Sequence, residues 1–382
     1  MTWLVLGLIV LATVISAPMC AALIAMGHRM GTFDSPGVAG QVKDRARRIP
    51  NTGGVAIFWS IVLPLLVFIG AAHWMPGLFP ESARAQLSYI ELKTPMALML
   101  IGCLALLHVM GLIDDRRPLG PLIKLVLMAL PALAAPLLMQ TRLLTALDPL
   151  VGGPWLSVVL TACWFLAITN AMNFLDNMDG LSAGIAAIAS ACLLAVTAEK
   201  QQWLLASCLA LIIGACAGFL FFNAPRPGGA RLFMGDGGSL VIGYLMAFVA
   251  VRVTYYDPAS AQSSRAHAVF MPVVILAVPL YDLIVITTVR LWQGKSPMVG
   301  DTNHASHRLV KRGLTRAGAV YVLWGFTLAT GLCGLALAKT DGFVAALIGA
   351  SVVAMLAVLA GLEYVSRGSM RATMPAPSER AA

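Results

Sequence analysis

The adjacent acids Asp114 and Asp115 close an apolar run in the string GLIDDRRPLGPLIK. Neighbouring positions on a helix point about 100° apart, so two adjacent carboxylates seldom serve a single structural purpose. Such a pair at the end of an apolar helix suits Mg²⁺ binding or proton transfer. The structural alternative is a solvated helix end beside Arg116 and Arg117.

A second group of polar residues lies in the string NAMNFLDNMDGL, which follows another apolar run. If this string is helical, its i, i+3 spacing places Asn173, Asp176 and Asp179 on similar faces. Carboxamides and carboxylates near a bilayer are costly unless they contact a ligand, a metal ion or one another. The alternative is a capping and turn cluster that ends a helix.

Glycines surround Asp236 in the string FMGDGGS, which begins a further apolar run. Glycine lets the backbone approach a ligand closely, and the N–H groups at a helix start attract phosphate oxygens. Asp236 would repel a bare phosphate but would serve if Mg²⁺ lay between the two. Phe233 is placed to stack on a base. The alternative is an ordinary glycine-rich helix cap with a packed aromatic side chain.

The most basic internal loop carries His304, His307 and Arg308. This spacing suggests a clamp for a phosphate or a sugar, half of a metal site, or simply a positively charged loop. Asp282 lies inside or near the end of an apolar run, where an acid marks function by default. A helix-end acid just short of the interface is the alternative for Asp282.

The string KDRARRIPNTGG mixes basic side chains with a proline and glycine turn. Its Arg45, Arg48 and Asn51 are candidate contacts for a phosphate or a lipid headgroup. Simple anchoring of this loop to anionic lipid explains the same residues equally well.

Composition indicates which elements must position these side chains. The 382-residue chain is 59% hydrophobic and 11% charged, with a mean hydropathy of +0.85. An ordinary soluble domain is roughly 25% charged. A soluble enzyme, a disordered chain and a secreted disulfide scaffold are therefore excluded in favour of a polytopic membrane protein. The seven cysteines all lie in apolar stretches without a CxxC motif, which predicts core residues rather than disulfides or zinc ligands.

The fold class predicted is all-α, a bundle of about 11 transmembrane helices, since a span needs about 20 apolar residues. The first span lacks a basic n-region and is too long for the apolar core of a signal peptide, so it is predicted to remain as a helix. A break at Pro279 is an option for the ninth span. The predicted spans are 2–26, 53–75, 95–113, 121–140, 155–172, 181–198, 202–222, 238–253, 267–289, 317–338 and 342–365.

Sidedness follows from the basic residues. Most of the 26 lysines and arginines fall in alternate links, which the positive-inside rule places in the cytoplasm. This predicts an outside N-terminus and a cytoplasmic C-terminus, with one membrane domain over 1–366 and a short disordered tail over 367–382. The same links hold the polar strings described above, so we expect one cytoplasm-facing site. The net charge of +9 is then explained by topology and by phosphate binding, without nucleic acid.

These strings, in this order, resemble the polyprenyl-phosphate N-acetylhexosamine-1-phosphate transferase superfamily. Its members include the undecaprenyl-phosphate GlcNAc-1-phosphate transferases and the phospho-MurNAc-pentapeptide translocase. The resemblance runs from about Asp34 to Arg308 and rests on IPNTGG, the acidic pair with its following lysine, NxxNxxD with DGL, FMGDxGS and the histidine loop. It implies transfer of a sugar-1-phosphate from a UDP-sugar to a polyprenyl phosphate such as undecaprenyl phosphate, with release of UMP.

The resemblance also implies a role for individual residues. Asp114 and Asp115 match the acidic pair, with Asp114 a base or an orienter of the lipid phosphate, and Lys124 matches the basic residue that follows. Mg²⁺, with Mn²⁺ as a substitute ion, is expected on Asp236 and Asp115. The residues expected to bind the nucleotide sugar are Asn173, Asp176, Asp179, Asn223, Phe233, His304, His307 and Arg308.

The expected reaction is direct attack by the lipid phosphate on the β-phosphorus of the donor, and a covalent aspartyl intermediate is the rival route. Two departures from the family pattern occur: Asn177 stands where glycine is usual, and the histidine loop reads HASHRL instead of adjacent histidines followed by Phe-Glu. The second departure favours UDP-GlcNAc over the MurNAc-pentapeptide donor.

A secondary transporter of an anionic solute is the rival from another class, disfavoured because the acids lie at loop ends on one side. Membrane lipids are expected partners, and a homodimer is left open.

Overall fold

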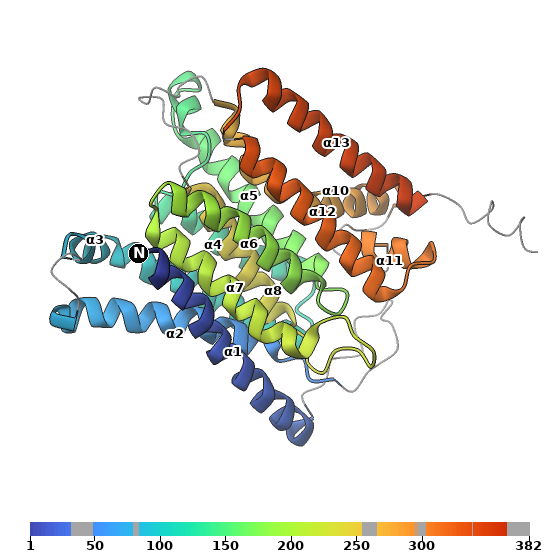
Figure 1. The fold of residues 1–382 in the computed structure, drawn as a ribbon, viewed down its shortest axis with the longest axis horizontal. Coiled ribbons are helices and arrows are strands. Elements are labelled where there is room, and N and C mark those ends of the chain that lie inside the picture. The colour runs from blue at the N-terminus through green and yellow to red at the C-terminus, as the bar shows by residue number, and fades with distance from the viewer. Residues whose placement is uncertain are drawn as a thin grey trace, which may run out of the picture.

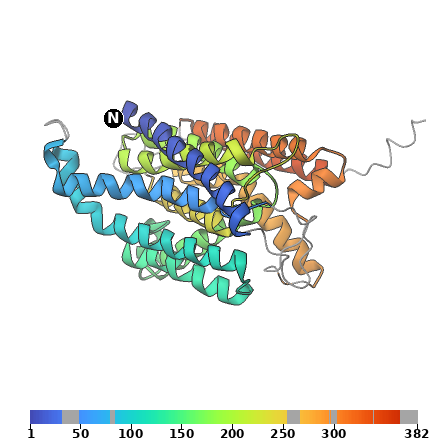
Figure 2. The same cartoon turned by 90° about the horizontal axis from the view of Figure 1, so that it is seen from below.

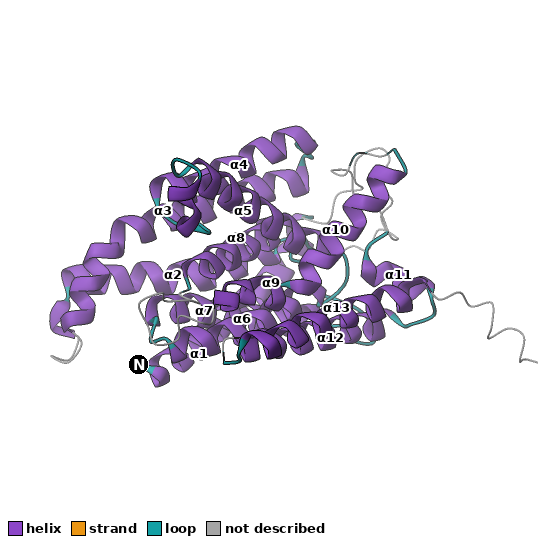
Figure 3. Ribbon diagram, turned by 90° about the horizontal axis from the view of Figure 1, so that it is seen from above, coloured by secondary structure: helices purple, strands orange, loops and turns teal. Residues whose placement is uncertain are grey.

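The computed structural model describes residues 1–31, 49–78, 84–253, 266–294, 296, 303–337 and 339–364. Within these ranges the chain is helical and contains no strand, as Figures 1 and 3 show. Figure 2 shows the helices in layers, with α3 (Arg84–Arg116) and α4 (Pro121–Leu138) on one side of the bundle and α12 (Arg316–Leu337) and α13 (Gly342–Tyr364) on the other. The predicted all-helical membrane fold is confirmed.

The bundle is built around α8 (Asp236–Arg252), which contacts five other helices (Figure 3). Every residue of α8 from Gly237 to Ala250 is buried. A helix that is apolar all round is expected in the interior, surrounded by other helices. The helices that surround it are α2 (Gly53–Trp74), α3, α5 (Trp155–Leu175), α6 (Leu181–Glu199) and α7 (Trp203–Asn223).

Small residues allow this close packing around α8. A side chain on Gly54 of α2 or on Gly111 of α3 would overlap the backbone at Gly237 and Gly238. The N-terminal end of α8 is therefore pressed against the start of α2 and the end of α3. Both contacts matter for the site, because Asp236 is the first residue of α8 and Asp115 lies near the end of α3.

The outer helices expose apolar side chains. On α1 (Thr2–Met30), the side chains of Leu4, Val10 and Val14 are exposed, and only a narrow stripe is buried against α7. Such a surface is stable when lipid tails rather than water surround it. Five of the seven free cysteines are buried as predicted, but Cys163 is exposed on α5 and Cys333 is half-buried, because each lies on a face that no other helix fully covers.

Nine helices in the described part of the chain are long and apolar enough to cross a membrane, or ten spans when one bent pair is counted as a single span. The protein is therefore a multi-pass membrane protein, with a smaller number of such spans than the 11 predicted. The difference lies in α8, whose 17 residues are fewer than the roughly 20 that usually cross the hydrocarbon core.

The bent pair is the ninth predicted span, with a bend of 68° between its two parts. They comprise η4 (Ala266–Phe270) with α9 (Met271–Ile275), followed by α10 (Ala277–Trp292). The break falls at Leu276, three residues before the predicted position. Pro279 lies in the first turn of α10, where its missing N–H is tolerated, so the helix is interrupted ahead of the proline rather than at it.

Candidate active site

Backbone pairing brings the first polar loop to the FMGDGGS segment. The N–H groups of Gly53 and Gly54 donate to the carbonyl oxygens of Phe233 and Met234, at 2.9 and 2.8 Å. The N–H of Phe233 in turn donates to the Pro50 carbonyl at 2.9 Å. These bonds fix the start of α2 beside the start of α8 and explain why two strings more than 170 positions apart belong to one site.

Asp115 and Asp236 meet at the start of α8. The backbone N–H of Asp236 donates to the two carboxylate oxygens of Asp115, at 3.0 and 3.3 Å. Gly235 has a φ of +70°, and a side chain there would overlap the side-chain oxygens of Asp115 and Asn51. Glycine is thus required at position 235 both for its backbone conformation and for the close approach of these side chains.

Lys124, near the start of α4, lies among the acidic residues. Its Nζ bonds Asp236 Oδ2 and lies 3.1 Å from Asp114 Oδ2 and 3.5 Å from Asn173 Oδ1. The other oxygen of Asp114 caps the N–H of Leu119 at 2.8 Å. Both oxygens of Asp114 are therefore engaged, and the short link between α3 and α4 is folded so that the lysine faces the acids.

Asn173, in the last turn of α5, completes this cluster. Its Nδ2 donates to Asp236 Oδ1 at 2.8 Å and to Ser239 Oγ at 2.9 Å. Burial on its own raises the pKa of Asp236, but the Lys124 charge and the hydrogen bonds from Lys124 and Asn173 outweigh it. The pKa of Asp236 therefore lies below its ordinary value, and the carboxylate is held in its charged form.

The donor set of this cluster fits Mg²⁺ when it is shared with a substrate. In the described ranges, no group of three or more His, Cys, Asp and Glu side chains is arranged to hold a metal ion alone. Mg²⁺, however, usually takes one or two carboxylates and completes its shell with water and substrate phosphates. Asp236 and Asp115 offer such a pair, and the position of the Lys124 ammonium shows that their surroundings accommodate positive charge.

The DNMDG string forms a turn that is attached to the loop before α8. Asn223, the last residue of α7, is 3% exposed and holds both sides: its Oδ1 accepts from the Gly180 N–H at 2.7 Å, and its Nδ2 donates to the Leu232 carbonyl at 2.8 Å. Asp179 Oδ2 accepts from the Ala230 N–H at 2.9 Å. Asn223 and Asp179 thus shape the wall of the site in the structure.

We expect Asn223→Ala to lower the free energy of unfolding by about 1–3 kcal/mol, because it leaves a buried N–H and a buried carbonyl without their partner. The thermal unfolding midpoint of the purified protein in detergent measures this loss. Asn170→Ala is the matched control, since the Asn170 amide donates only to Leu166 within its own helix. Equal midpoints for the two variants would contradict the role of Asn223.

Asn177, the departure from the family pattern, links this turn to the histidine loop. Its Nδ2 donates to the Phe174 carbonyl at 2.6 Å, and its Oδ1 accepts from Ser306 Oγ at 2.6 Å. A glycine could make neither bond. The second departure, the HASHRL string, supplies Ser306, so the two departures contact each other.

The histidine loop contains the short helix α11 (Ala305–Lys311). Asp282 of α10, which is 1% exposed, accepts from Nδ1 of His304 at 2.8 Å and from the Ala305 N–H at 2.7 Å. His304 also meets the ring of Phe174 edge-on, with ring centroids 5.7 Å apart. Asp282, noted from sequence as an isolated acid, therefore belongs to the site through His304.

Arg308 and His307 occupy different positions on α11. The guanidinium of Arg308 pairs with Glu363 of α13, with an NH2 to Oε2 distance of 2.7 Å. His307 is half-buried. The structure therefore brings His304 to the end of α5 but directs the charge of Arg308 towards α13.

The end of α5 connects all of these groups. Asn173 contacts the acid cluster, Phe174 and Asn177 contact α11, and Asp179 contacts the loop before α8. Asp176, the C-cap of α5, lies close enough to Asp115 to repel it electrostatically. Phe233 is half-buried beside the start of α2. The predicted residues Arg45 and Arg48 lie outside the described residues.

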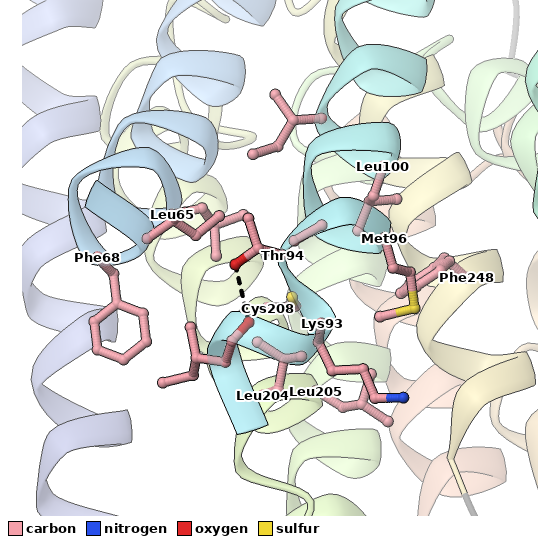
Figure 4. A pocket seen from close by; sticks show the side chains of 14 residues that line it. Leu65, Phe68, Lys93, Thr94, Met96, Leu100, Leu204, Leu205, Cys208 and Phe248 are labelled. Carbon is pink, nitrogen blue, oxygen red and sulfur yellow. Dashed lines mark hydrogen bonds between the residues drawn. The ribbon is translucent and has the colours of Figure 1, made fainter. Parts of the chain in front are cut away.

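A separate apolar pocket lies between α2, α3, α7 and α8 (Figure 4). Leu65, Leu100, Leu205 and Phe248 are among its lining residues, and Lys93 is at its edge. Leu100 precedes Asp115 by 15 positions on α3, which at 1.5 Å per residue is about 22 Å along the helix. The pocket is therefore distinct from the acid cluster.

Comparison with known proteins shows which family contains these motifs. Residues 97–254 match the model of the family described as glycosyl transferase family 4, a stretch that includes the acidic pair, the α5 end and Asp236. A decaprenyl-phosphate N-acetylglucosaminephosphotransferase of Mycobacterium tuberculosis is 30% identical over 81% of this chain and 78% of its own length.

Two further relatives carry closely related names. The "Probable undecaprenyl-phosphate N-acetylglucosaminyl 1-phosphate transferase" of Bacillus subtilis is 27% identical over 78% of this chain and 74% of its own length. The undecaprenyl-phosphate alpha-N-acetylglucosaminyl 1-phosphate transferase of Yersinia pestis is 27% identical over 80% of this chain and 76% of its own length. The chain therefore belongs to glycosyl transferase family 4, the phosphoglycosyltransferase family of its polyprenyl-phosphate GlcNAc-1-phosphate transferase relatives.

Proposed function

We propose that the protein transfers GlcNAc-1-phosphate, or the phosphate of a related N-acetylhexosamine, from a UDP-sugar to undecaprenyl phosphate and releases UMP. The observation that carries this proposal is the convergence of two carboxylates, a lysine and a carboxamide at Asp115, Asp236, Lys124 and Asn173. The names of the relatives indicate the same sugar phosphate, N-acetylglucosamine 1-phosphate, and a polyprenyl-phosphate acceptor. The product would begin the lipid-linked synthesis of a cell-envelope glycan such as lipopolysaccharide or another polysaccharide.

We place this site on the cytoplasmic face of the inner membrane, with the N-terminus outside and the C-terminus inside. The support is the distribution of lysines and arginines in the links. One membrane domain over 1–366, a short disordered tail over 367–382 and assembly as a homodimer are further parts of the proposal.

Magnesium is the proposed cofactor, with manganese as a substitute, held by Asp236 and Asp115 together with the donor pyrophosphate. When bound, it would neutralise charge that develops on the transferring phosphoryl group. Asn173 orients Asp236 through the hydrogen bond at Oδ1. Lys124 offsets the negative charge of Asp236 and Asp114 before substrate arrives, which reduces the repulsion between these acids.

The chemical step we propose is a direct displacement. An oxygen of the lipid phosphate forms a bond to the β-phosphorus of the donor, and the bond from that phosphorus to the bridging oxygen breaks. UMP leaves with the electron pair. A phosphate monoester with a second pKa near 6 is largely ionised at pH 7, so the chain need not supply a strong base. Asp114, with both oxygens engaged, would orient the acceptor through Lys124.

The donor end would extend along the end of α5. Asp176, Asp179, Asn223 and Phe233 would form the nucleotide subsite, with Asp179 and Asn223 acting through the shape of the turn they hold. The histidine loop would face the pyrophosphate and sugar with His304 and His307, and Arg308, which is paired with Glu363, would act by holding this loop in place. Asn51 and the arginines at 45 and 48 would contact phosphate or lipid.

An assay of purified protein with a choice of donors tests the function. UDP-GlcNAc and UDP-MurNAc-pentapeptide are supplied separately with undecaprenyl phosphate and Mg²⁺, and UMP and lipid product are measured. Turnover of UDP-GlcNAc supports the proposal. Turnover of only the pentapeptide donor would instead support a peptidoglycan translocase, and solute uptake without UMP release would indicate a transporter.

We expect EDTA to stop UMP release and added Mg²⁺ to restore it, since two carboxylates and a pyrophosphate otherwise bring uncompensated negative charge together. Initial rates before chelation, after chelation and after titration with MgCl₂ measure the effect, and MnCl₂ tests substitution. Thermal unfolding in the same samples controls for loss of fold. Full turnover in EDTA would contradict the proposed role of Asp236.

A further inference from the structure

The helix α11, which carries the histidine loop, is only seven residues long. An isolated helix of this length is unstable in water, because the cost of its first turn is not recovered. Its position must therefore come from contacts with the rest of the chain. In the described residues α12 packs on α11, and side-chain hydrogen bonds tie the segment to α10, the turn at Asn177 and the last turn of α13.

The contact with α13 is made by Glu363, which is 1% exposed. Its Oε2 accepts hydrogen bonds from Nε of Arg308 at 2.8 Å and from the Tyr281 hydroxyl at 3.0 Å, and it forms an ion pair with NH2 of Arg308 at 2.7 Å. The backbone carbonyl of Glu363 accepts from Nε of Arg312, the C-cap of α11, at 2.6 Å. One residue of α13 thus holds two arginines of α11.

Arg308 also contacts the segment that contains His304. Its NH1 donates to the carbonyl of Asn303, the residue just before His304. On the other side, Asp282 binds Nδ1 of His304, and its neighbour Tyr281 binds Glu363. The contacts form a closed ring through α10, α11 and α13, and the orientation of the imidazole depends on both sides of it.

The cost of burying Glu363 indicates that the contact is more than packing. On α13 the buried residues Ala345, Val352 and Leu359 form one stripe, and Glu363 continues it. An apolar residue at this position would continue the stripe without cost, whereas a buried carboxylate requires charged partners. The charged partner of its carboxylate is Arg308 of α11, so the interaction holds that helix in one place.

We propose that Glu363 is a positioning residue for phosphosugar transfer: through Arg308 it fixes α11, so that His304 presents Nε2 to the pyrophosphate of the UDP-sugar. This inference rests on the proposed function. Glu363 also lies far beyond residues 97–254, the part of the chain that matches the family model.

The test compares wild type, Glu363→Gln and the control Glu199→Gln, all as full-length purified protein. Glu199 is an exposed acid paired with Lys339 at 3.0 Å. Steady-state kinetics give separate KM values for the UDP-sugar and for undecaprenyl phosphate. Hydrogen–deuterium exchange of peptides covering 303–311 measures the stability of α11 without any substrate.

We expect Glu363→Gln to raise the donor KM about ten-fold, to leave the acceptor KM unchanged and to increase exchange in α11, because it removes the ion pair with Arg308 and weakens the charge-assisted hydrogen bond from Arg308 Nε. A merely structural defect would lower the fraction of active enzyme and hence kcat, with both KM values unchanged. A donor KM equal to wild type in folded Glu363→Gln overturns the proposal. A raised donor KM without faster exchange in α11 also overturns it.

If Glu363→Gln does not fold, Tyr281→Phe is tested instead, since it removes only the hydroxyl that donates to Glu363. The donor KM and the exchange in α11 then support or overturn the proposal in the same way. A smaller shift, about three-fold in donor KM, is expected for loss of one hydrogen bond. Should wild-type protein release no UMP from any UDP-sugar, the proposed function fails. The exchange measurement then still shows whether Glu363 holds α11.

Discussion

Asp236→Asn is expected to reduce UMP release by about 1,000-fold or more, while the protein continues to fold. The carboxylate is the proposed ligand of Mg²⁺, and loss of a metal-held charge removes several kcal/mol of transition-state stabilisation. Asparagine has almost the same shape, and the backbone N–H that donates to Asp115 is retained. The packing of α8 against α2 and α3 does not involve the carboxylate charge.

The measurement is the initial rate of UMP release at saturating donor and acceptor, with the amount of folded protein determined by its unfolding transition. Asp341→Asn provides a control, because Asp341 is an exposed acid whose carboxylate accepts from the Val344 N–H at the start of α13, remote from the acid cluster in the chain. A rate for Asp236→Asn within ten-fold of wild type would remove Asp236 from the catalytic set.

The contacts of Lys124 also predict how stable the Asp236→Asn variant is. In the wild type its ammonium lies between Asp236 and Asp114. With asparagine at position 236, Lys124 retains Asp114, so the cluster loses one negative charge but no buried cation is stranded. We therefore expect the variant to unfold within a few degrees of wild type, and the loss of rate then reports on chemistry rather than folding.

The sequence predicted the acid cluster well because its members lie at the ends of long apolar helices. Asp115, Lys124, Asn173 and Asp236 each interrupt or end an apolar run, so each stands out without knowledge of the fold. In the structure these helix ends lie together, as their contacts show. What periodicity could not predict is that the Asp236 N–H, rather than its side chain, makes the direct bond to Asp115.

Asn223 and Asp179 show where residue type alone was insufficient. Polar residues beside a nucleotide motif were expected to contact the ligand, but a buried carboxamide also satisfies buried backbone groups. In the structure both side chains bond backbone atoms of neighbouring segments. Which backbone groups need a partner depends on the tertiary fold, which the sequence pattern does not reveal.

Glu363 carries a signal that is visible in the sequence. An acid within an apolar span is unusual, and it lies inside the predicted span 342–365. Its partner Arg308 was predicted for the donor instead, because a basic residue beside two histidines resembles a phosphate clamp. The pairing joins positions 55 apart through two helices of the bundle, and only the packing of α11 on α13 shows it.

Asp115→Asn is expected to lower UMP release by a similar factor of about 1,000, for a reason that depends on the mechanism. In the direct displacement, Asp115 would help to hold the metal ion, and its carboxylate accepts from the Asp236 N–H at the start of α8. In the covalent route, its carboxylate would itself attack the donor, and asparagine would be inactive in every partial reaction. Asp148→Asn is a matched control, because Asp148 is half-buried and paired with Arg142 at 2.6 Å.

The partial reaction separates the two mechanisms. Wild-type protein is incubated with UDP-sugar and radiolabelled UMP without undecaprenyl phosphate, and label entering the UDP-sugar is measured. Direct displacement requires the lipid phosphate, so no exchange is expected. Exchange in wild type that disappears in Asp115→Asn would establish a covalent aspartyl intermediate. Asp176 and Asp236 both repel the Asp115 carboxylate, and this accumulation of negative charge suits a pyrophosphate that is bound through a metal ion better than attack on that pyrophosphate by one of the acids.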